Sequence, residues 1–336
     1  MKILLRLLLS LGLAAALLGA LAVWVGVEWD EVRGAFSKLS LEVLSSALAV
    51  HASIYVFRAW RFRLLVPKED RPPFLGTLAV SAAHNLAAYV LPAKTGEATF
   101  VVYANRALGL PLAPGAASLL VSRLLDLIGL ALLLGTACLG ADSLALEGQA
   151  MPTWVRALGL VLLAAGSAFA ILLWRGERLA PLFSFAVRLC GLDRTKWGPK
   201  LRSLGGRTVE AVRASRSGPG FVPAIFLTLP IWLGIFLFYA VLARGFGLPD
   251  SISLAQATFG SGLAVVANLA PINGLAGFGT QEAGWVVGFH SLGVSRDLAF
   301  STGVGAHLVQ LFDVALFGLL GHLAMGLFKP KAAPTA

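Results

Sequence analysis

The chain has 336 residues, of which 57% are hydrophobic and only 13% are charged, and its formal net charge is +10. Soluble domains carry about 25% charged residues, so this composition excludes an ordinary soluble protein and indicates an all-α, polytopic membrane protein. The alternating pattern of a membrane barrel is absent. Cys138 and Cys190 lie on different segments without metal-ligand spacing, so we expect no disulfide framework, metal site or cofactor.

Six apolar segments are expected to cross the bilayer, because each reaches or approaches the roughly 20 residues that a crossing helix requires. The first follows Lys2 and Arg6 and so imitates a signal peptide, but it is longer than a usual signal core, and we expect a retained span. In chain order the expected spans cover residues 7–27, 41–57, 112–140, 155–174, 221–243 and 298–328.

The distribution of charge predicts how these spans are oriented. Basic side chains gather in residues 58–71 and 175–216, whereas residues 28–38 and 141–154 are acid-leaning. Basic loops stay in the cytoplasm, so this bias places both termini there.

Two segments between the spans must leave and re-enter the membrane on the same side if the orientations are to agree. They are residues 74–110 and 250–297, and each contains a helix-breaking stretch, at Pro92–Glu97 and at Pro271–Gly279. Broken helices that meet near the membrane midplane recur in secondary transporters. We therefore expect two re-entrant helical hairpins in addition to about six full spans.

The two hairpins enter from opposite faces, which predicts an inverted repeat within a single membrane domain over residues 1–336. The first repeat covers residues 41–140 and the second covers residues 221–328. A basic cytoplasmic linker, residues 175–220, joins them. This linker is either a solvated loop or a surface that contacts anionic lipid, to which each basic residue contributes roughly 1 kcal/mol; Leu179–Leu192 is amphipathic enough to lie on the membrane.

Polar residues recur in the same order in the two repeats, at membrane depth, where carboxylates are costly and are usually kept for a reason. The candidate substrate-binding residues of the first repeat are Asn85, Lys94, Glu97, Arg123 and Asp126, with Arg58 on the preceding span. Those of the second repeat are Asn268, Glu282, Gln310 and Asp313.

The two glutamates have two possible roles. Thr95–Glu97 and Gly279–Glu282 both have the pattern of a helix start, where a carboxylate can satisfy free backbone donors as a purely structural cap. The same helix start at membrane depth can instead bind phosphate, and Lys94 would strengthen such a site.

The aspartates differ between the repeats. Arg123 and Asp126 are three residues apart on one helix and can neutralise each other. Gln310 replaces the arginine in the second repeat, so Asp313 has no local cation and must find a partner elsewhere; His307 and His322 lie on the same span. This asymmetry argues against a mechanism in which the two halves are equivalent.

Four motifs in order resemble the lysylphosphatidylglycerol synthase transmembrane-region family, over about residues 5–328. They are the Arg-Trp element of Phe57–Leu65, the Pro-x-Lys-x-Gly-Glu element of Leu91–Glu97, the Arg-x-x-Asp element of Ser122–Asp126, and the glycine-rich element of Pro271–Glu282. The resemblance implies a flippase-like domain of the type that moves aminoacylated phosphatidylglycerol between leaflets in the multiple peptide resistance factor. It also implies a stand-alone member without the aminoacyl-transferase domain.

The expected function is therefore lipid translocation rather than enzyme catalysis, since no nucleophile or metal motif is present. The substrate implied by the resemblance is an anionic or aminoacylated phospholipid, a polyprenyl-linked lipid or a hopanoid, and no nucleic acid is expected. The alternative is a non-transporting scaffold that binds lipid or partner enzymes through the basic linker.

Overall fold

A computed structural model describes residues 39–140, 150–175, 198–269 and 275–328, together with a few isolated positions. These residues form helices and contain no strand. The expected span at residues 7–27 and most of Leu179–Leu192 lie outside them. The helices, in chain order, are α3 (Leu41–Leu64), α4 (Phe74–Val90), α5 (Thr99–Leu108), α6 (Leu112–Leu139), α7 (Thr153–Trp174), α9 (Gly198–Ser217), α10 (Phe221–Gly245), α11 (Leu254–Leu269), α12 (Thr280–Ser291) and α13 (Arg296–Met325).

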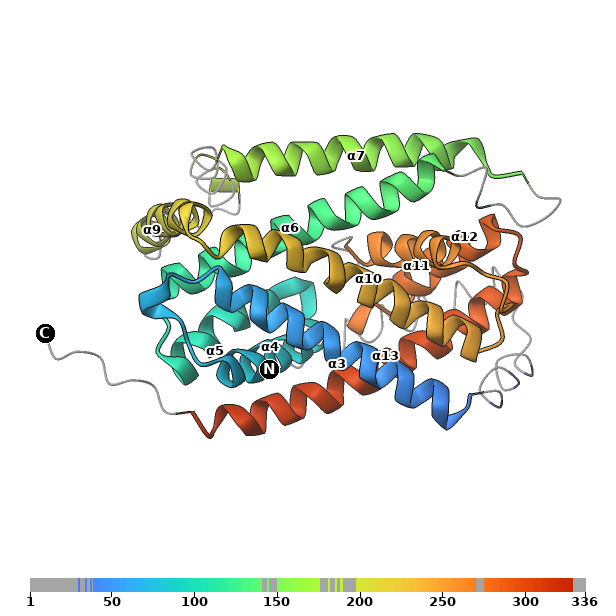
Figure 1. The fold of residues 1–336 in the computed structure, drawn as a ribbon, viewed down its shortest axis with the longest axis horizontal. Helices are drawn as coiled ribbons and strands as arrows, with labels where there is room; N and C mark the ends of the chain where they lie inside the picture. The colour runs from blue at the N-terminus through green and yellow to red at the C-terminus, as the bar shows by residue number, and fades with distance from the viewer. Residues whose placement is uncertain are drawn as a thin grey trace, which may run out of the picture.

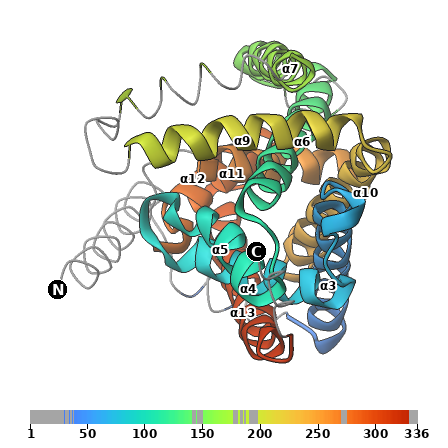
Figure 2. The same ribbon diagram turned by 90° about the vertical axis from the view of Figure 1, so that its left-hand side faces the viewer.

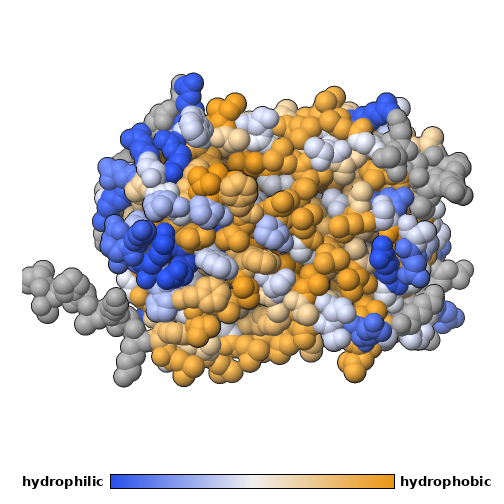
Figure 3. Space-filling model, in the orientation of Figure 1, coloured by the Kyte–Doolittle hydropathy of each residue, from blue (hydrophilic) through white to orange (hydrophobic). Residues whose placement is uncertain are grey.

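Five of the described helices are long and apolar enough to cross a membrane: α3, α6, α7, α10 and α13. They run along the long axis of the molecule in Figure 1. On the face drawn in Figure 3, an apolar band separates two ends that carry hydrophilic residues. Length, composition and surface therefore agree on a multi-pass helical membrane protein.

Helix α3 is longer than the sequence predicts. We expected the span to end near residue 57 and residues 58–71 to form a cytoplasmic loop, but the helix continues to Leu64. The reason is that Arg61 is only 1% exposed and finds partners inside the protein, so its charge does not require water. The basic residues of this segment therefore led to a prediction of a longer loop than the structure contains.

Two shorter helix pairs are broken where prolines and glycines were noted. Helices α4 and α5 are joined by the 3₁₀ segment η2 (Pro92–Ala98), and α12 follows the short 3₁₀ segment η6 (Leu275–Gly277). Figure 1 places α4 and α5 toward the left-hand end and α11 and α12 toward the right-hand end. The two breaks thus belong to helix pairs that fill opposite ends of the same bundle.

Glycines set the close approach of the second pair. A Cβ added to Gly288 of α12 would overlap the backbone carbonyl of Gly260 on α11, and one added to Gly284 would lie 2.5 Å from the carbonyl oxygen of Leu263. Small residues let membrane helices pack backbone to backbone. Helices α11 and α12 therefore pack closely against each other, and these contacts hold α12 in place against α11.

Part of the basic linker is helical rather than irregular. Helix α9 buries Val209 and Val212 against the cluster formed by α6, α7 and α10, and leaves Arg207 and Arg213 exposed. Arg216 donates to the carbonyl of Trp174 and lies over its ring. Figure 2 shows α9 lying across the end of the bundle at which α4 and α5 are found.

Candidate functional site

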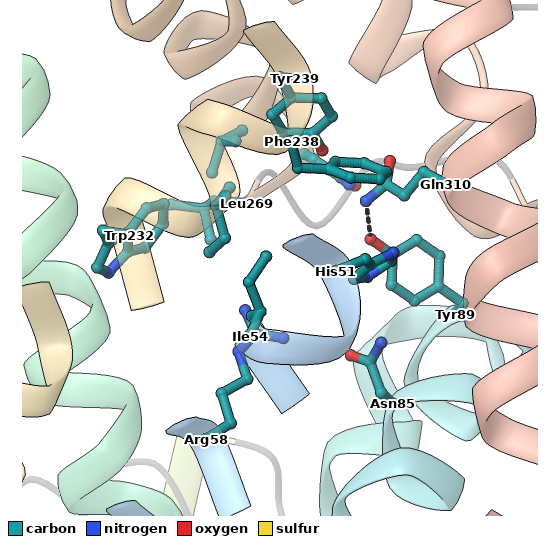
Figure 4. Close-up of a pocket in the computed structure, with 13 residues that line it drawn as sticks. His51, Ile54, Arg58, Asn85, Tyr89, Trp232, Phe238, Tyr239, Leu269 and Gln310 are labelled. Carbon is teal, nitrogen blue, oxygen red and sulfur yellow. Dashed lines mark hydrogen bonds between the residues drawn. The ribbon is translucent and has the colours of Figure 1, made fainter. Parts of the chain in front are cut away.

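A polar cavity lies between the two halves of the chain, where α3, α4, α10, α11 and α13 meet (Figure 4). Its volume is about 170 Å³. It is lined by His51, Ile54, Arg58, Asn85, Tyr89, Trp232, Ile235, Phe238, Tyr239, Val265, Asn268, Leu269 and Gln310. A cavity of this size holds several water molecules or a small polar group, and both repeats contribute to its wall.

Four of the residues singled out in the sequence line this cavity: Arg58, Asn85, Asn268 and Gln310. Arg58 is the important one, because its buried Nε has no hydrogen-bond partner and the described residues give it no ion pair. An arginine inside a membrane protein normally pairs with a carboxylate or a carbonyl. The described structure therefore offers an uncompensated guanidinium to whatever enters the cavity.

A chain of amide side chains connects the second repeat to the first across the cavity. Asn268 donates to Gln281 Oε1 at 3.1 Å, Gln281 donates to Gln310 Oε1 at 2.8 Å, and Gln310 donates to the hydroxyl of Tyr89 at 2.5 Å. One turn before Tyr89 on α4, Asn85 donates to the hydroxyl of Tyr55 on α3 at 2.7 Å. Asn85 and Asn268 thus form hydrogen bonds with other side chains of the protein, and Arg58 is the cationic residue that lines the cavity.

The first repeat holds its carboxylates with arginines. Arg123 donates to Glu97 Oε2 from Nε at 2.9 Å and from Nη2 at 2.7 Å, and its Nη1 reaches Asp126 Oδ2 at 3.3 Å. The predicted Arg123–Asp126 pair is therefore present. Both carboxylates share one guanidinium, which joins η2 to α6.

Arg61 completes this cluster and was not among the predicted site residues. Its Nη2 donates to Asp126 Oδ1 at 2.7 Å, and its Nη1 donates to Thr228 Oγ1 of α10 at 3.2 Å. The sequence offered a signal, because Arg61 belongs to the Arg-Trp element, but the element does not show which arginine points inward. Of these arginines, Arg61 has a structural role because it pairs with Asp126, whereas Arg58 lines the cavity.

Glu97 does not cap a helix, contrary to one of the two predicted roles. Helix α5 begins at Thr99 after Ala98, and its N-terminus has no side-chain cap. Because η2 is a 3₁₀ segment that precedes the helix, the carboxylate of Glu97 turns toward Arg123 instead, with His84 Nε2 3.7 Å away. Glu97 therefore links the 3₁₀ segment η2 to helix α6 through its ion pair with Arg123.

Glu282 does occupy the helix start that the sequence predicts. It lies in the first turn of α12, and its Oε2 accepts a hydrogen bond of 2.7 Å from the backbone N–H of Gly279. Its second oxygen contacts His307 Nδ1 at 2.5 Å, and His307 Nε2 lies 3.2 Å from the carbonyl oxygen of Ala276. Both side chains of this pair are fully buried.

Asp313 finds its partner on a different helix from the histidines noted in the sequence. His51 of α3 contacts Asp313 Oδ2 at 3.0 Å through Nδ1, while His307 binds Glu282 and His322 contacts Gly318 and Tyr103. The partner is 262 residues away along the chain, which no local spacing could indicate. A buried histidine in an apolar helix was itself the available signal for His51.

Lys94 lies in η2, and its side chain is outside the described residues. The remaining nine predicted residues form three groups. Arg58, Asn85, Asn268 and Gln310 line the cavity, Glu97, Arg123 and Asp126 form the arginine cluster, and Glu282 and Asp313 each contact a histidine.

An apolar groove of about 390 Å³ runs along α3, α4 and α13 beside the cavity. Its walls are almost entirely hydrocarbon, and include Val56, Leu75, Phe317 and Ala324. Tyr55 belongs to this groove, and its hydroxyl accepts the hydrogen bond from Asn85, which lines the cavity. The Tyr55–Asn85 hydrogen bond therefore connects the wall of the polar cavity to the wall of the apolar groove.

Comparison with known families gives one result for almost the whole chain. Residues 3–318 match the family described as the lysylphosphatidylglycerol synthase TM region. No individually curated protein matches the sequence.

Proposed function

The chain belongs to the lysylphosphatidylglycerol synthase TM-region family, and from this premise we propose that it moves a lipid with an anionic headgroup between the leaflets of the membrane. The family and the five membrane-length helices support a membrane protein connected with lipid. Translocation itself, and its location in a bacterial inner membrane with both termini in the cytoplasm, are parts of the proposal.

The observation that carries the proposal is the uncompensated charge of Arg58. Arg58, Arg61 and Arg123 lie close together, and the carboxylates of Glu97 and Asp126 neutralise two of the three. One positive charge is left over, and it belongs to the side chain that lines the cavity. A phosphate oxygen would supply the missing partner, because guanidinium and phosphate form short, charge-assisted hydrogen bonds.

The headgroup passes through the cavity while the apolar tail occupies the groove beside it. The groove adjoins the cavity at Tyr55, so both parts of one lipid can be held at the same time. The tail then never leaves an apolar environment, and only the polar headgroup requires a protein path. This division keeps the cost of moving the lipid low, because the expensive step is taking a charged headgroup out of water.

Opening of the two breaks would give the headgroup access from each side. We propose that α4–α5 and α11–α12 are re-entrant hairpins of an inverted repeat, because they lie toward opposite ends of the bundle and both lie next to the cavity (Figure 1). Glu97 with Arg123 closes the first break, and Glu282 with His307 closes the second. The gates differ in chemistry, so the two access steps are not equivalent.

Reconstitution into liposomes with a leaflet-specific fluorescent phospholipid tests the function. Vesicles that contain the protein should move the anionic reporter to the other leaflet faster than protein-free vesicles. Arg123→Ala, which removes the ion pair at the first break, should change that rate, whereas Leu160→Met on the outer face of α7 should not. Equal rates in protein-free and protein-containing vesicles would contradict the proposal.

A scaffold role for the basic linker is the second candidate. The exposed face of α9 carries Arg207 and Arg213, which suits an anionic lipid surface or an acidic partner. If this were the function, neutralising those two arginines would abolish it and Arg58→Gln would not. The translocation account predicts the reverse.

A further inference from the structure

We propose that the protein also binds one exchangeable proton, at the pair formed by His307 and Glu282, and that this proton moves with the lipid. The lipid part rests on the proposed function, whereas the proton site stands on its own geometry. The ligand is therefore a hydrogen ion, and the site is the buried end of α12 where it meets α13.

We assign the protons of this pair from the hydrogen-bond partners of its two side chains. His307 Nε2 faces the carbonyl oxygen of Ala276 at 3.2 Å, and a carbonyl can only accept, so Nε2 carries a hydrogen. Nδ1 lies 2.5 Å from Glu282 Oε1, and two lone pairs at that distance would repel, so a second proton lies between them. The pair is then neutral overall, as imidazolium with carboxylate or as imidazole with carboxylic acid.

Loss of the shared proton would leave a net negative charge at a place where both side chains are 0% exposed. Such a charge is strongly disfavoured in the membrane interior unless the surroundings rearrange. The pair also holds the N-terminus of α12 and the segment η6, since Glu282 binds Gly279 and His307 binds Ala276. Proton release is therefore coupled to movement of the N-terminus of α12.

Among the described residues, no permanent charge is paired with Glu282 in a way that could take over this role. From α10 the pair faces Tyr239, which lies within electrostatic range of Glu282, and α11 contributes no titratable side chain over Leu254–Leu269. Helix α4 contributes Tyr89, which is bonded to Gln310, and α3 contributes His51, which is paired with Asp313. Within the described chain, no arginine or lysine forms an ion pair with Glu282.

The other carboxylates do not require an exchangeable proton. Arg61 and Arg123 hold Asp126 and Glu97, and a guanidinium does not release its proton in proteins. His51 contacts Asp313 only through Nδ1, so the hydrogen bonds of that pair do not by themselves require a second proton on the imidazole. The first repeat is thus permanently charged, and the second contains the only pair among the described residues whose hydrogen bonds demand a removable proton.

A short connection leads from this pair to the lipid cavity. Gln281 is adjacent to Glu282 and bonds both Asn268 and Gln310, which line the cavity. Movement of the N-terminus of α12 on proton release therefore moves two cavity-lining amides. The proton enters from water on one side and leaves to water on the other, and no other bond is made or broken.

Proton counting on the purified full chain tests the site without any lipid transport. In weakly buffered detergent with a pH indicator, wild type should release one proton per chain more than Glu282→Gln as the pH is raised from mildly acidic to alkaline. Glu210→Gln, which removes an exposed carboxylate of α9, should match wild type across the neutral range. Equal release from wild type and Glu282→Gln would overturn the proposal.

A measurement on wild type alone covers the case in which Glu282→Gln does not fold. Proteoliposomes with an entrapped pH indicator should show proton movement when the transported lipid is added to one leaflet, and an imposed pH gradient should change the lipid rate several-fold. Lipid movement that is indifferent to the gradient and moves no protons would overturn the coupling and leave the proposed function intact. Absence of lipid movement would overturn the proposed function, while proton counting would still decide the site.

Discussion

Gln310 of α13 donates a hydrogen bond of 2.5 Å to the hydroxyl of Tyr89 on α4, and so joins the two halves of the chain beside the cavity. Gln310 holds the place in the second repeat that Arg123 holds in the first. Instead of binding the glutamate of its own repeat, it reaches the other half of the chain. A glutamine at this position, where the predicted repeat would place an arginine, therefore links the two halves of the chain.

Tyr89→Phe should destabilise the protein by about 1–3 kcal/mol, because the buried amide of Gln310 would lose its partner. Thermal unfolding in detergent measures this change. Tyr103→Phe is the matched control, since its hydroxyl contacts His322 at an exposed position and its loss should cost within about 0.5 kcal/mol. Similar unfolding temperatures for the two variants would show that the cross-cavity bond contributes nothing.

Asp126→Asn should be among the most damaging substitutions in the membrane domain. Arg61 is 1% exposed, and removing one partner of a buried pair typically costs about 3–5 kcal/mol because the other charge is left uncompensated. Expression level and unfolding temperature report the loss.

Glu97→Gln provides the contrast for that prediction. The side chains of Glu97 and Arg123 are 38% and 34% exposed, so their pair is partly screened and its loss should cost about 1 kcal/mol or less. Its effect should appear instead in the rate of lipid movement, because the pair closes the first break. If Glu97→Gln destabilises the protein as strongly as Asp126→Asn, the Glu97–Arg123 pair is not the weak, partly screened interaction described above.

Gly288→Ala should force α11 and α12 apart, since the new Cβ would overlap the carbonyl of Gly260. Overpacking of this kind costs typically about 1–3 kcal/mol. Gly206→Ala in α9 is the control, because nothing lies within 4 Å of the added carbon and alanine favours a helix by up to about 1 kcal/mol. We expect opposite shifts in unfolding temperature, and a shift of the same sign in both variants would refute the glycine contact.

Ala324→Trp should fill the apolar groove without touching the polar cavity. Lipid translocation should slow and less lipid should co-purify, as measured by native mass spectrometry. Leu160→Trp adds an indole to the exposed face of α7, far from the groove in sequence, and should leave both measurements unchanged. Unaltered lipid content in Ala324→Trp would mean that the tail lies elsewhere.

Much of the fold follows from the sequence, because long apolar runs end at prolines, glycines and charges. Helix α6 begins after Pro111 and ends before Gly140, close to the predicted 112–140, and α10 covers the predicted 221–243. The error at α3 has a clear physical reason. A positive charge predicts a loop only if the charge must be solvated by water, and the charge of Arg61 is instead neutralised by an ion pair with Asp126.

The site was predictable in its residue types and not in its pairings. Placing a carboxylate inside a membrane is energetically costly, and this cost singled out Glu97, Asp126, Glu282 and Asp313. The partners of these carboxylates depend on which helices lie side by side. Asp313 meets His51 only because α13 packs against α3, and Arg61 could not be told from Arg58 without the direction of each side chain. Sequence spacing gave the one pair that lies on a single helix, Arg123 with Asp126.

The most direct test of the central claim compares the initial translocation rates of an anionic and a zwitterionic phospholipid in wild type and Arg58→Gln. A charge-assisted hydrogen bond is worth about 1.5–3 kcal/mol, and about 1.4 kcal/mol is a tenfold change. Arg58→Gln should therefore slow the anionic lipid about tenfold or more, Arg58→Lys should retain part of the rate, and Arg207→Gln on α9 should match wild type. An anionic lipid that moves as fast in Arg58→Gln as in wild type would contradict the account.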